Sequence, residues 1–118
     1  MTMRLSVAWL YISWCNMNSI IQTEKECFLC GSRIPTGYWD GLEDHHIFFG
    51  FSSKNRDKSE ELGLKVWLCG ETCHRNGKKS VHKDRETDLL LKRIAQEAYE
   101  NTYGSRADFI REFGKSYL

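Results

Sequence analysis

Four of the five cysteines in this 118-residue chain come as two close pairs. Two residues separate Cys27 from Cys30 and three separate Cys69 from Cys73, with a long segment between the pairs. Five cysteines fit either a secreted disulfide scaffold or an intracellular metal site, and the spacing favours the second. Two distant pairs of thiolates are what a tetrahedral zinc ion takes. The pattern therefore predicts a structural zinc ion that joins two parts of the chain.

The small size of the chain also favours a structural zinc ion. A domain of this length buries only part of the surface that its unfolded form exposes. The hydrophobic fraction of 41%, one proline and nine glycines are typical of a folded protein and not of a disordered one. No repeat or Pro/Gly/Ser-rich linker divides the sequence. We therefore predict a single domain over residues 17–118.

The N-terminal segment resembles a signal peptide only superficially. Residues 5–15 are almost entirely apolar and follow Arg4, but the stretch is too short to span a bilayer. The residues around Cys15 also lack the small-residue pattern of a cleavage site. We expect residues 1–16 to be an apolar extension from an over-long reading frame, with the native chain beginning at Met17. The alternative is a strand or helix packed on the domain. The expected location is the cytoplasm, without membrane association.

The charge distribution is more informative than the net charge of +1. Between Lys54 and Arg85, basic residues outnumber acidic residues by nine to five. This segment can face a phosphate backbone, or it can be an ordinary solvated surface. The candidate nucleic-acid contacts in it are Arg56, Lys58, Lys78 and Lys79.

Two predicted strands bracket a polar stretch. Residues 38–49 have the β-branched and aromatic content of a strand, and residues 64–68 alternate apolar and polar side chains. Residues 52–61 between them are predicted to be a loop or a short exposed helix. The large aromatic side chains of this region are expected to be core residues rather than platforms for base stacking: Trp39, Phe48, Phe49 and Trp67.

A helical period begins after Asp84. Apolar residues recur there at spacings of three and four, acidic residues fill the first turns, and Gly104 is placed to end the helix. Ser105, with Asp108 three residues later, resembles a capping box and predicts a second helix that ends near Gly114. These two helices are expected to cover the hairpin.

All four histidines lie between Asp44 and Lys83. His45 and His46 are adjacent near the end of a predicted strand, His74 follows a cysteine, and His82 precedes the long helix. A neutral imidazole can bind a metal ion or take a proton from water near neutral pH. Because neighbouring residues of a strand point to opposite faces, one site can use both His45 and His46 only where the strand bends or ends.

Three landmarks carry a resemblance to a known family. Cys27-x-x-Cys30, Glu43-Asp44-His45-His46-Ile47-Phe48 and Leu68-Cys69-x-x-x-Cys73-His74 resemble, in this order, the motifs of zinc-bearing HNH endonucleases. The resemblance covers residues 27–82, and the block from Asp84 onward is similar to the tail of small HNH proteins of phages and prophages. It implies an α+β fold with a ββα-metal core, also called the HNH or His-Me finger, together with a four-cysteine zinc knuckle site and C-terminal helices.

The same resemblance implies an activity and the residues that carry it. His46 is the expected general base, and His45 and His74 are the expected ligands of a catalytic divalent ion. Colicin-type relatives use three histidine ligands, so His82 is expected to complete the set. The ion, such as Mg²⁺, Mn²⁺ or Zn²⁺, would stabilise charge on the phosphate. The expected reaction is hydrolysis of DNA phosphodiester bonds.

Two features depart from the family pattern. The second cysteine pair has three intervening residues, where the family usually has two. The family's middle asparagine, which orients the base, is replaced at the corresponding place by Gly63-Leu64. Asn55 or Asn76 can substitute for it, and Asn55 is the preferred candidate.

Other functions fit parts of the same pattern. The first alternative is a zinc-stabilised module that binds nucleic acid without catalysis. A specialised phage function, such as junction resolution or help to DNA packaging, is a third hypothesis. DNA is the expected partner, and phage packaging or recombination proteins are further candidates. A small nicking domain would also need to form a homodimer to cut both strands together.

Overall fold

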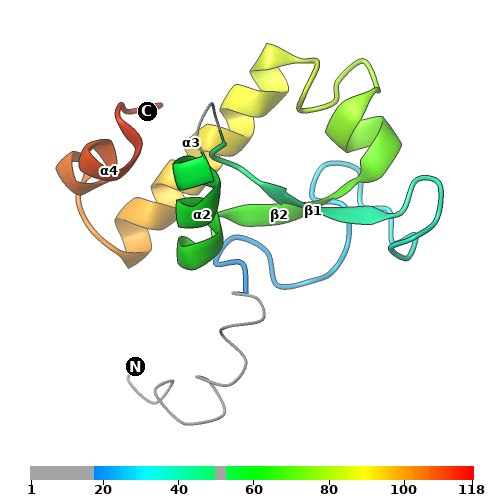
Figure 1. Cartoon of the computed structure of the whole chain (residues 1–118), viewed down its shortest axis with the longest axis horizontal. Coiled ribbons are helices and arrows are strands. Elements are labelled where there is room, and N and C mark those ends of the chain that lie inside the picture. Colours follow the sequence, from blue (N-terminus) through cyan, green and yellow to red (C-terminus); the bar gives the residue numbers. More distant parts are fainter. Residues whose placement is uncertain (1–17, 50–52) are drawn as a thin grey trace, which may run out of the picture.

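The computed structural model describes residues 18–49 and 53–118, so the predicted extension over residues 1–16 lies outside the described residues. The chain forms a small α+β fold (Figure 1). In chain order its elements are β1 (Leu42–His46), α2 (Ser53–Leu62), β2 (Lys65–Cys69), the π-helix η2 (Gly70–Arg75), α3 (Arg85–Thr102) and α4 (Arg106–Phe113). No helix of the described residues has both the length and the apolar character needed to cross a membrane.

The two strands form an antiparallel hairpin. Leu42 pairs with Cys69 at one end of the register, and His46 pairs with Lys65 at the other. The strand predicted at residues 64–68 is confirmed within one residue. The strand predicted at 38–49 is shorter than expected, because the segment before β1 folds into turns closed by backbone hydrogen bonds, including one of 2.9 Å from Gly41 N to the Tyr38 carbonyl.

Helix α2 connects the two strands. The polar stretch between them was predicted to be a loop or a short exposed helix, and it is the helix. Its buried Ser59 hydroxyl accepts a hydrogen bond from Phe48 N at 3.0 Å and donates one to Phe48 O at 2.9 Å. Both backbone groups of Phe48 are thereby satisfied in the interior. These bonds attach α2 to the segment that directly follows β1.

The C-terminal helices begin at side-chain caps. The Asp84 carboxylate accepts a hydrogen bond from Thr87 N at the start of α3. The predicted capping box of Ser105 and Asp108 is present at the start of α4, and Gly114 ends that helix at a φ of 96°. Helix α3 ends at Thr102 with Tyr103 as its C-cap, so Gly104 directly follows the end of the helix, as predicted.

The core lies between the hairpin and the two C-terminal helices (Figure 1). Phe48 is 2% exposed and its ring packs against Phe109 and Phe113. The prediction that the large aromatics are core residues is therefore right for Phe48. It is wrong for Phe49, which is 38% exposed, and for Trp39, which is 79% exposed because the turns before β1 leave its side chain in solvent.

Candidate metal centre and active site

The hairpin brings the two cysteine pairs together. Cys27 and Cys30 lie in the loop before β1, whereas Cys69 ends β2 and Cys73 lies in η2. Their four sulfur atoms all lie within 4.8 Å of one another, and the Sγ atoms of Cys30 and Cys69 are 3.4 Å apart. Sulfur atoms bound to one tetrahedral zinc ion at about 2.3 Å would be about 3.8 Å apart. The cluster is therefore compatible with a structural zinc site.

The electrostatics of this four-cysteine cluster also suit a cation. Burial opposes ionisation of Cys27, but hydrogen bonds from backbone amides, Cys30 first, lower the pKa of its thiol to about 7. Burial first, and the neighbouring sulfur atoms of Cys30 and Cys27 after it, raise the pKa of Cys69 to about 12. Burial likewise raises the pKa of Cys73. Four thiolates at this spacing therefore need a bound cation to offset their repulsion.

Three histidines converge at a second cluster. His45 lies in β1, His74 in η2 and His82 in the loop before α3, and one nitrogen from each ring lies within 4.8 Å of the other two. The loop is fixed to η2 by backbone hydrogen bonds, because His82 N donates to His74 O at 3.2 Å. The structure thus brings together the three residues expected to be ligands, from three separate segments.

The nitrogen spacing in the three-histidine cluster fits a metal ion. His45 Nδ1 lies 3.3 Å from His74 Nε2. Two imidazole nitrogens bound to one ion at about 2.1 Å in tetrahedral geometry would be about 3.4 Å apart. Within the described part of the chain, His45 Nε2 is buried without a hydrogen-bond partner, whereas His82 is exposed and leaves one side of the cluster open.

The environment keeps His45 neutral. Burial is the largest cause, and the nearby His74, His82 and His46 add to it, so that the pKa of His45 falls to about 3. Burial and the neighbouring His74 also lower the pKa of His82. A neutral imidazole is the form that binds metal ions, so these rings need not lose a proton before binding.

Glu43 makes a hydrogen bond with His74 of η2. It lies on β1 two residues before His45, on the same face of the strand. Its Oε1 atom lies 2.9 Å from His74 Nδ1, and the same carboxylate pairs with Arg75. A carboxylate only accepts hydrogen bonds, so His74 Nδ1 donates and Nε2 is left with its lone pair toward His45. The family resemblance did not assign this role to Glu43, although its position two residues before His45 places both side chains on one face of the strand.

His46 has a different set of partners. Its Nε2 atom lies 2.7 Å from Oε1 of Glu60 on α2. Lys65, which faces His46 across the hairpin, donates to both carboxylate oxygens of Glu60 at 3.0 Å and to Asp44 at 3.2 Å. His45 and His46 thus point to opposite faces of β1, as alternation along a strand requires.

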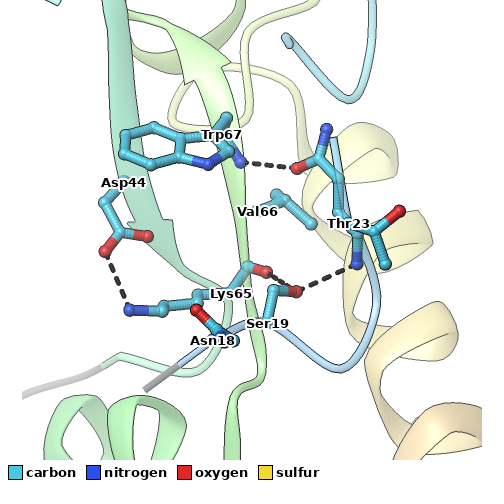
Figure 2. A pocket seen from close by; sticks show the side chains of 8 residues that line it. Asn18, Ser19, Thr23, Asp44, Lys65, Val66 and Trp67 are labelled. Carbon is cyan, nitrogen blue, oxygen red and sulfur yellow. Dashed lines mark hydrogen bonds and ion pairs between the residues drawn. The ribbon is translucent and has the colours of Figure 1, made fainter. Parts of the chain in front are cut away.

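A pocket of about 400 Å³ opens beside the ion pair of Asp44 and Lys65. Figure 2 shows these two side chains facing each other, with Trp67 and Ser19 also in the lining. The lining contains none of the histidines. The pocket is therefore next to the partners of His46 and separate from the three-histidine cluster.

Among the described residues, neither of the two asparagines proposed to orient His46 makes a hydrogen bond to its ring. Asn76 donates to both carboxylate oxygens of Glu71, at 3.0 and 3.1 Å. Asn55 lies on α2, and no hydrogen bond joins it to His46 among the residues that the structure describes. The role of Asn55 therefore stays a prediction, and Glu60 is the partner that sequence reasoning missed.

The basic residues expected to contact nucleic acid come from two segments. Arg56 and Lys58 lie on α2, and Lys58 Nζ donates to the Glu112 carbonyl of α4 at 2.6 Å. Lys78 and Lys79 are exposed in the loop between η2 and α3, the loop that also carries His82. Lys78 and Lys79 therefore lie in the same loop as His82 of the three-histidine cluster, whereas Arg56 and Lys58 lie on α2.

Comparisons with protein-family models, with curated proteins and with solved structures find no match for this chain. A function for the protein is accordingly inferred from the residues of the site.

Proposed function

We propose that this protein is a divalent-metal-dependent endonuclease of the HNH type that hydrolyses DNA phosphodiester bonds. The observation that carries the proposal is the convergence of His45, His74 and His82, each from a different segment, beside a strand that ends at His46. A cluster of three imidazoles with one open side is typical of a catalytic metal site, whereas closed structural sites use four protein ligands. The four-cysteine cluster supplies the structural site separately.

The proposed roles follow from the contacts of each histidine. His45, His74 and His82 would hold the divalent ion, which supplies positive charge for the phosphate and the leaving oxygen. Glu43 orients His74 by accepting the Nδ1 proton. His46 has 14% of its side chain exposed and serves as the base that takes a proton from water.

The end of β1 allows the two adjacent histidines to serve one substrate. His45 and His46 point to opposite faces, but His46 is the last residue of the strand. Their rings are also near enough that His46 contributes, after burial and the other two histidines, to the lowered pKa of His45. A phosphodiester seated at the end of the strand would lie between them.

The substrate class rests on the positive charge of the loop that carries His82. Lys78 and Lys79 are exposed on the loop that carries His82. Such lysines neutralise backbone phosphates without reading base sequence. The proposal therefore names DNA as the substrate class, with affinity that falls as the salt concentration rises.

The test is cleavage of supercoiled plasmid by zinc-loaded protein with added Mg²⁺, Mn²⁺ or Zn²⁺. Loss of the base should lower the nicking rate of His46→Ala by about 10²- to 10⁴-fold. The same variant should keep the zinc of the four-cysteine cluster and the affinity for DNA. Arg33→Ala, which changes an exposed arginine paired with Glu26, is the matched control and should cut at the rate of the unchanged protein.

Three outcomes would count against the enzyme. They are equal nicking by the unchanged protein and His46→Ala, no nicking with any of the ions, and nicking that persists after His45→Ala and His74→Ala. DNA binding without nicking by any form would favour the zinc-stabilised binding module instead.

A further inference from the structure

Glu60 makes a short polar contact with the His46 ring. The distance from Glu60 Oε1 to His46 Nε2 is 2.7 Å, and the side chains are 32% and 14% exposed. Charge-assisted hydrogen bonds have this length when their geometry is favourable. The contact joins α2 to the last residue of β1, so it depends on the packing of two separate elements.

Lys65 fixes the Glu60 carboxylate in turn. Its ammonium donates to both oxygens of Glu60 at 3.0 Å and to Asp44 at 3.2 Å, while only 7% of the lysine side chain is exposed. Asp44, His46 and Glu60 also have potential ligand atoms within 4.8 Å of one another. An ion bound among them would have to displace the buried ammonium, so this face is better suited to hold a histidine than a metal.

We propose that Glu60 is the positioning residue of His46 and takes the role that the sequence assigned to Asn55. The carboxylate accepts the Nε2 proton and fixes the ring in the tautomer whose Nδ1 carries the lone pair. Within the described residues, no hydrogen bond to Nδ1 is present. This nitrogen is the one available to a water molecule.

The catalytic part of this inference rests on the proposed function. A water proton passes to His46 Nδ1 as the water oxygen forms a bond to phosphorus. The bond from phosphorus to the leaving oxygen breaks, and that oxygen takes a proton from solvent. Glu60 stays ionised throughout and stabilises the imidazolium that forms, as the carboxylate of a Ser-His-Asp triad does.

The experiment compares four variants of the zinc-loaded protein. Glu60→Ala removes the acceptor, and Glu60→Gln keeps an acceptor oxygen and the side-chain volume while removing the charge. Glu61→Ala changes the neighbouring exposed glutamate of α2 and is the matched control. Asn55→Ala tests the competing residue. Far-UV circular dichroism and zinc content establish that each variant is folded.

The kinetic readout separates positioning from substrate binding. Glu60→Ala should lower kcat on plasmid DNA by about 10²- to 10⁴-fold and leave KM within about twofold. Glu60→Gln should lie between Glu60→Ala and the unchanged protein, whereas Glu61→Ala and Asn55→Ala should change neither constant. A kcat of both Glu60 variants within about twofold of the unchanged protein would overturn the proposal. A large loss confined to Asn55→Ala would overturn it as well.

A spectroscopic readout keeps this inference distinct from the nuclease activity. Nitrogen-15 NMR of the His46 ring, recorded at about pH 8 where an ordinary imidazole is neutral, reports which nitrogen carries the proton. The unchanged protein should show the Nε2–H tautomer, and Glu60→Ala should show a mixture of tautomers. This result without plasmid cleavage would support the role of Glu60 and contradict the nuclease. Identical tautomers in both proteins would overturn the role of Glu60 whether or not the protein cuts DNA.

Discussion

Oε1 of Glu43 lies 2.9 Å from Nδ1 of His74, on the side of the ring away from His45. The other ring nitrogen, Nε2, lies 3.3 Å from His45 Nδ1. One hydrogen bond therefore determines both the tautomer of His74 and the direction of its lone pair. Glu43 would therefore not bind the proposed ion itself but would orient His74, one of its proposed ligands.

Substitution of Glu43 should weaken metal binding without unfolding the protein. Because outer partners typically change metal affinity by about 10- to 100-fold, Glu43→Ala should lower the affinity for Mn²⁺ within this range. Isothermal titration of zinc-loaded protein measures the change. Glu71→Ala is the control, since Glu71 also pairs with Arg75 but does not contact His74. Equal Mn²⁺ affinity of Glu43→Ala and the unchanged protein would contradict the role.

Gly70 offers a second way to disturb the same carboxylate. A Cβ atom at this position would lie 2.7 Å from Glu43 Oε2 and 2.8 Å from its Cδ. Gly70→Ala should therefore displace the carboxylate and weaken Mn²⁺ binding in the same direction as Glu43→Ala. In the double variant the second change should have little further effect, because both act through one contact. Additive losses in a titration of the four proteins would show independent mechanisms.

The three-histidine cluster shows what the sequence can predict. The resemblance to HNH endonucleases implied that His45, His74 and His82 would lie together, and the structure places one nitrogen of each ring within 4.8 Å of the other two. That its members bind an ion stays a prediction. The strand at 65–69 and both C-terminal helices were also accessible, because their hydrophobic periods and caps are local signals.

Glu60 and Trp39 show why other features of the fold and the site could not be predicted from the sequence. The contact of Glu60 with His46 depends on how α2 packs on the hairpin, and a polar helix without a clear apolar face does not reveal this. Trp39 has the composition of a core residue, but the turns around it leave its side chain in solvent. Both errors have one cause, since composition does not determine the tertiary direction of a side chain.

Asp40 should make stability depend on pH. Its carboxylate accepts hydrogen bonds from Glu71 N at 2.9 Å, Thr72 N at 3.2 Å and Thr72 Oγ1 at 2.7 Å, and so attaches the loop before β1 to η2. Burial acts to raise the pKa of Asp40, but these hydrogen bonds outweigh burial and hold the pKa below its usual value. The stabilisation is therefore complete above the pKa of the unfolded chain, about 3.9, and is lost as the pH falls through the lower pKa of the folded protein.

Asp40→Ala should lower the free energy of unfolding by about 1.5–3 kcal/mol at neutral pH, the usual net contribution of hydrogen bonds to a charged group. Urea unfolding of both proteins at several pH values measures the difference, which should shrink below about pH 4. Asp57→Ala, at an exposed position of α2, is the control and should change stability little. A difference between Asp40→Ala and the unchanged protein that stays constant down to pH 3 would contradict the assignment.

Zinc at the four-cysteine cluster should be required for the fold, because it joins the loop before β1 to the end of β2 and to η2. Binding energies of structural zinc in small domains are about 10–16 kcal/mol and appear as folding energy. Cys27→Ser should therefore lose the bound zinc and the cooperative thermal transition, as a strong chelator should do to the unchanged protein. Arg33→Ala, at an exposed position of the same loop, should keep the zinc of the four-cysteine cluster and the original Tm. A chelated protein that retains its transition, measured by circular dichroism with zinc quantified in parallel, would show that the core of Phe48, Phe109 and Phe113 is sufficient without the ion.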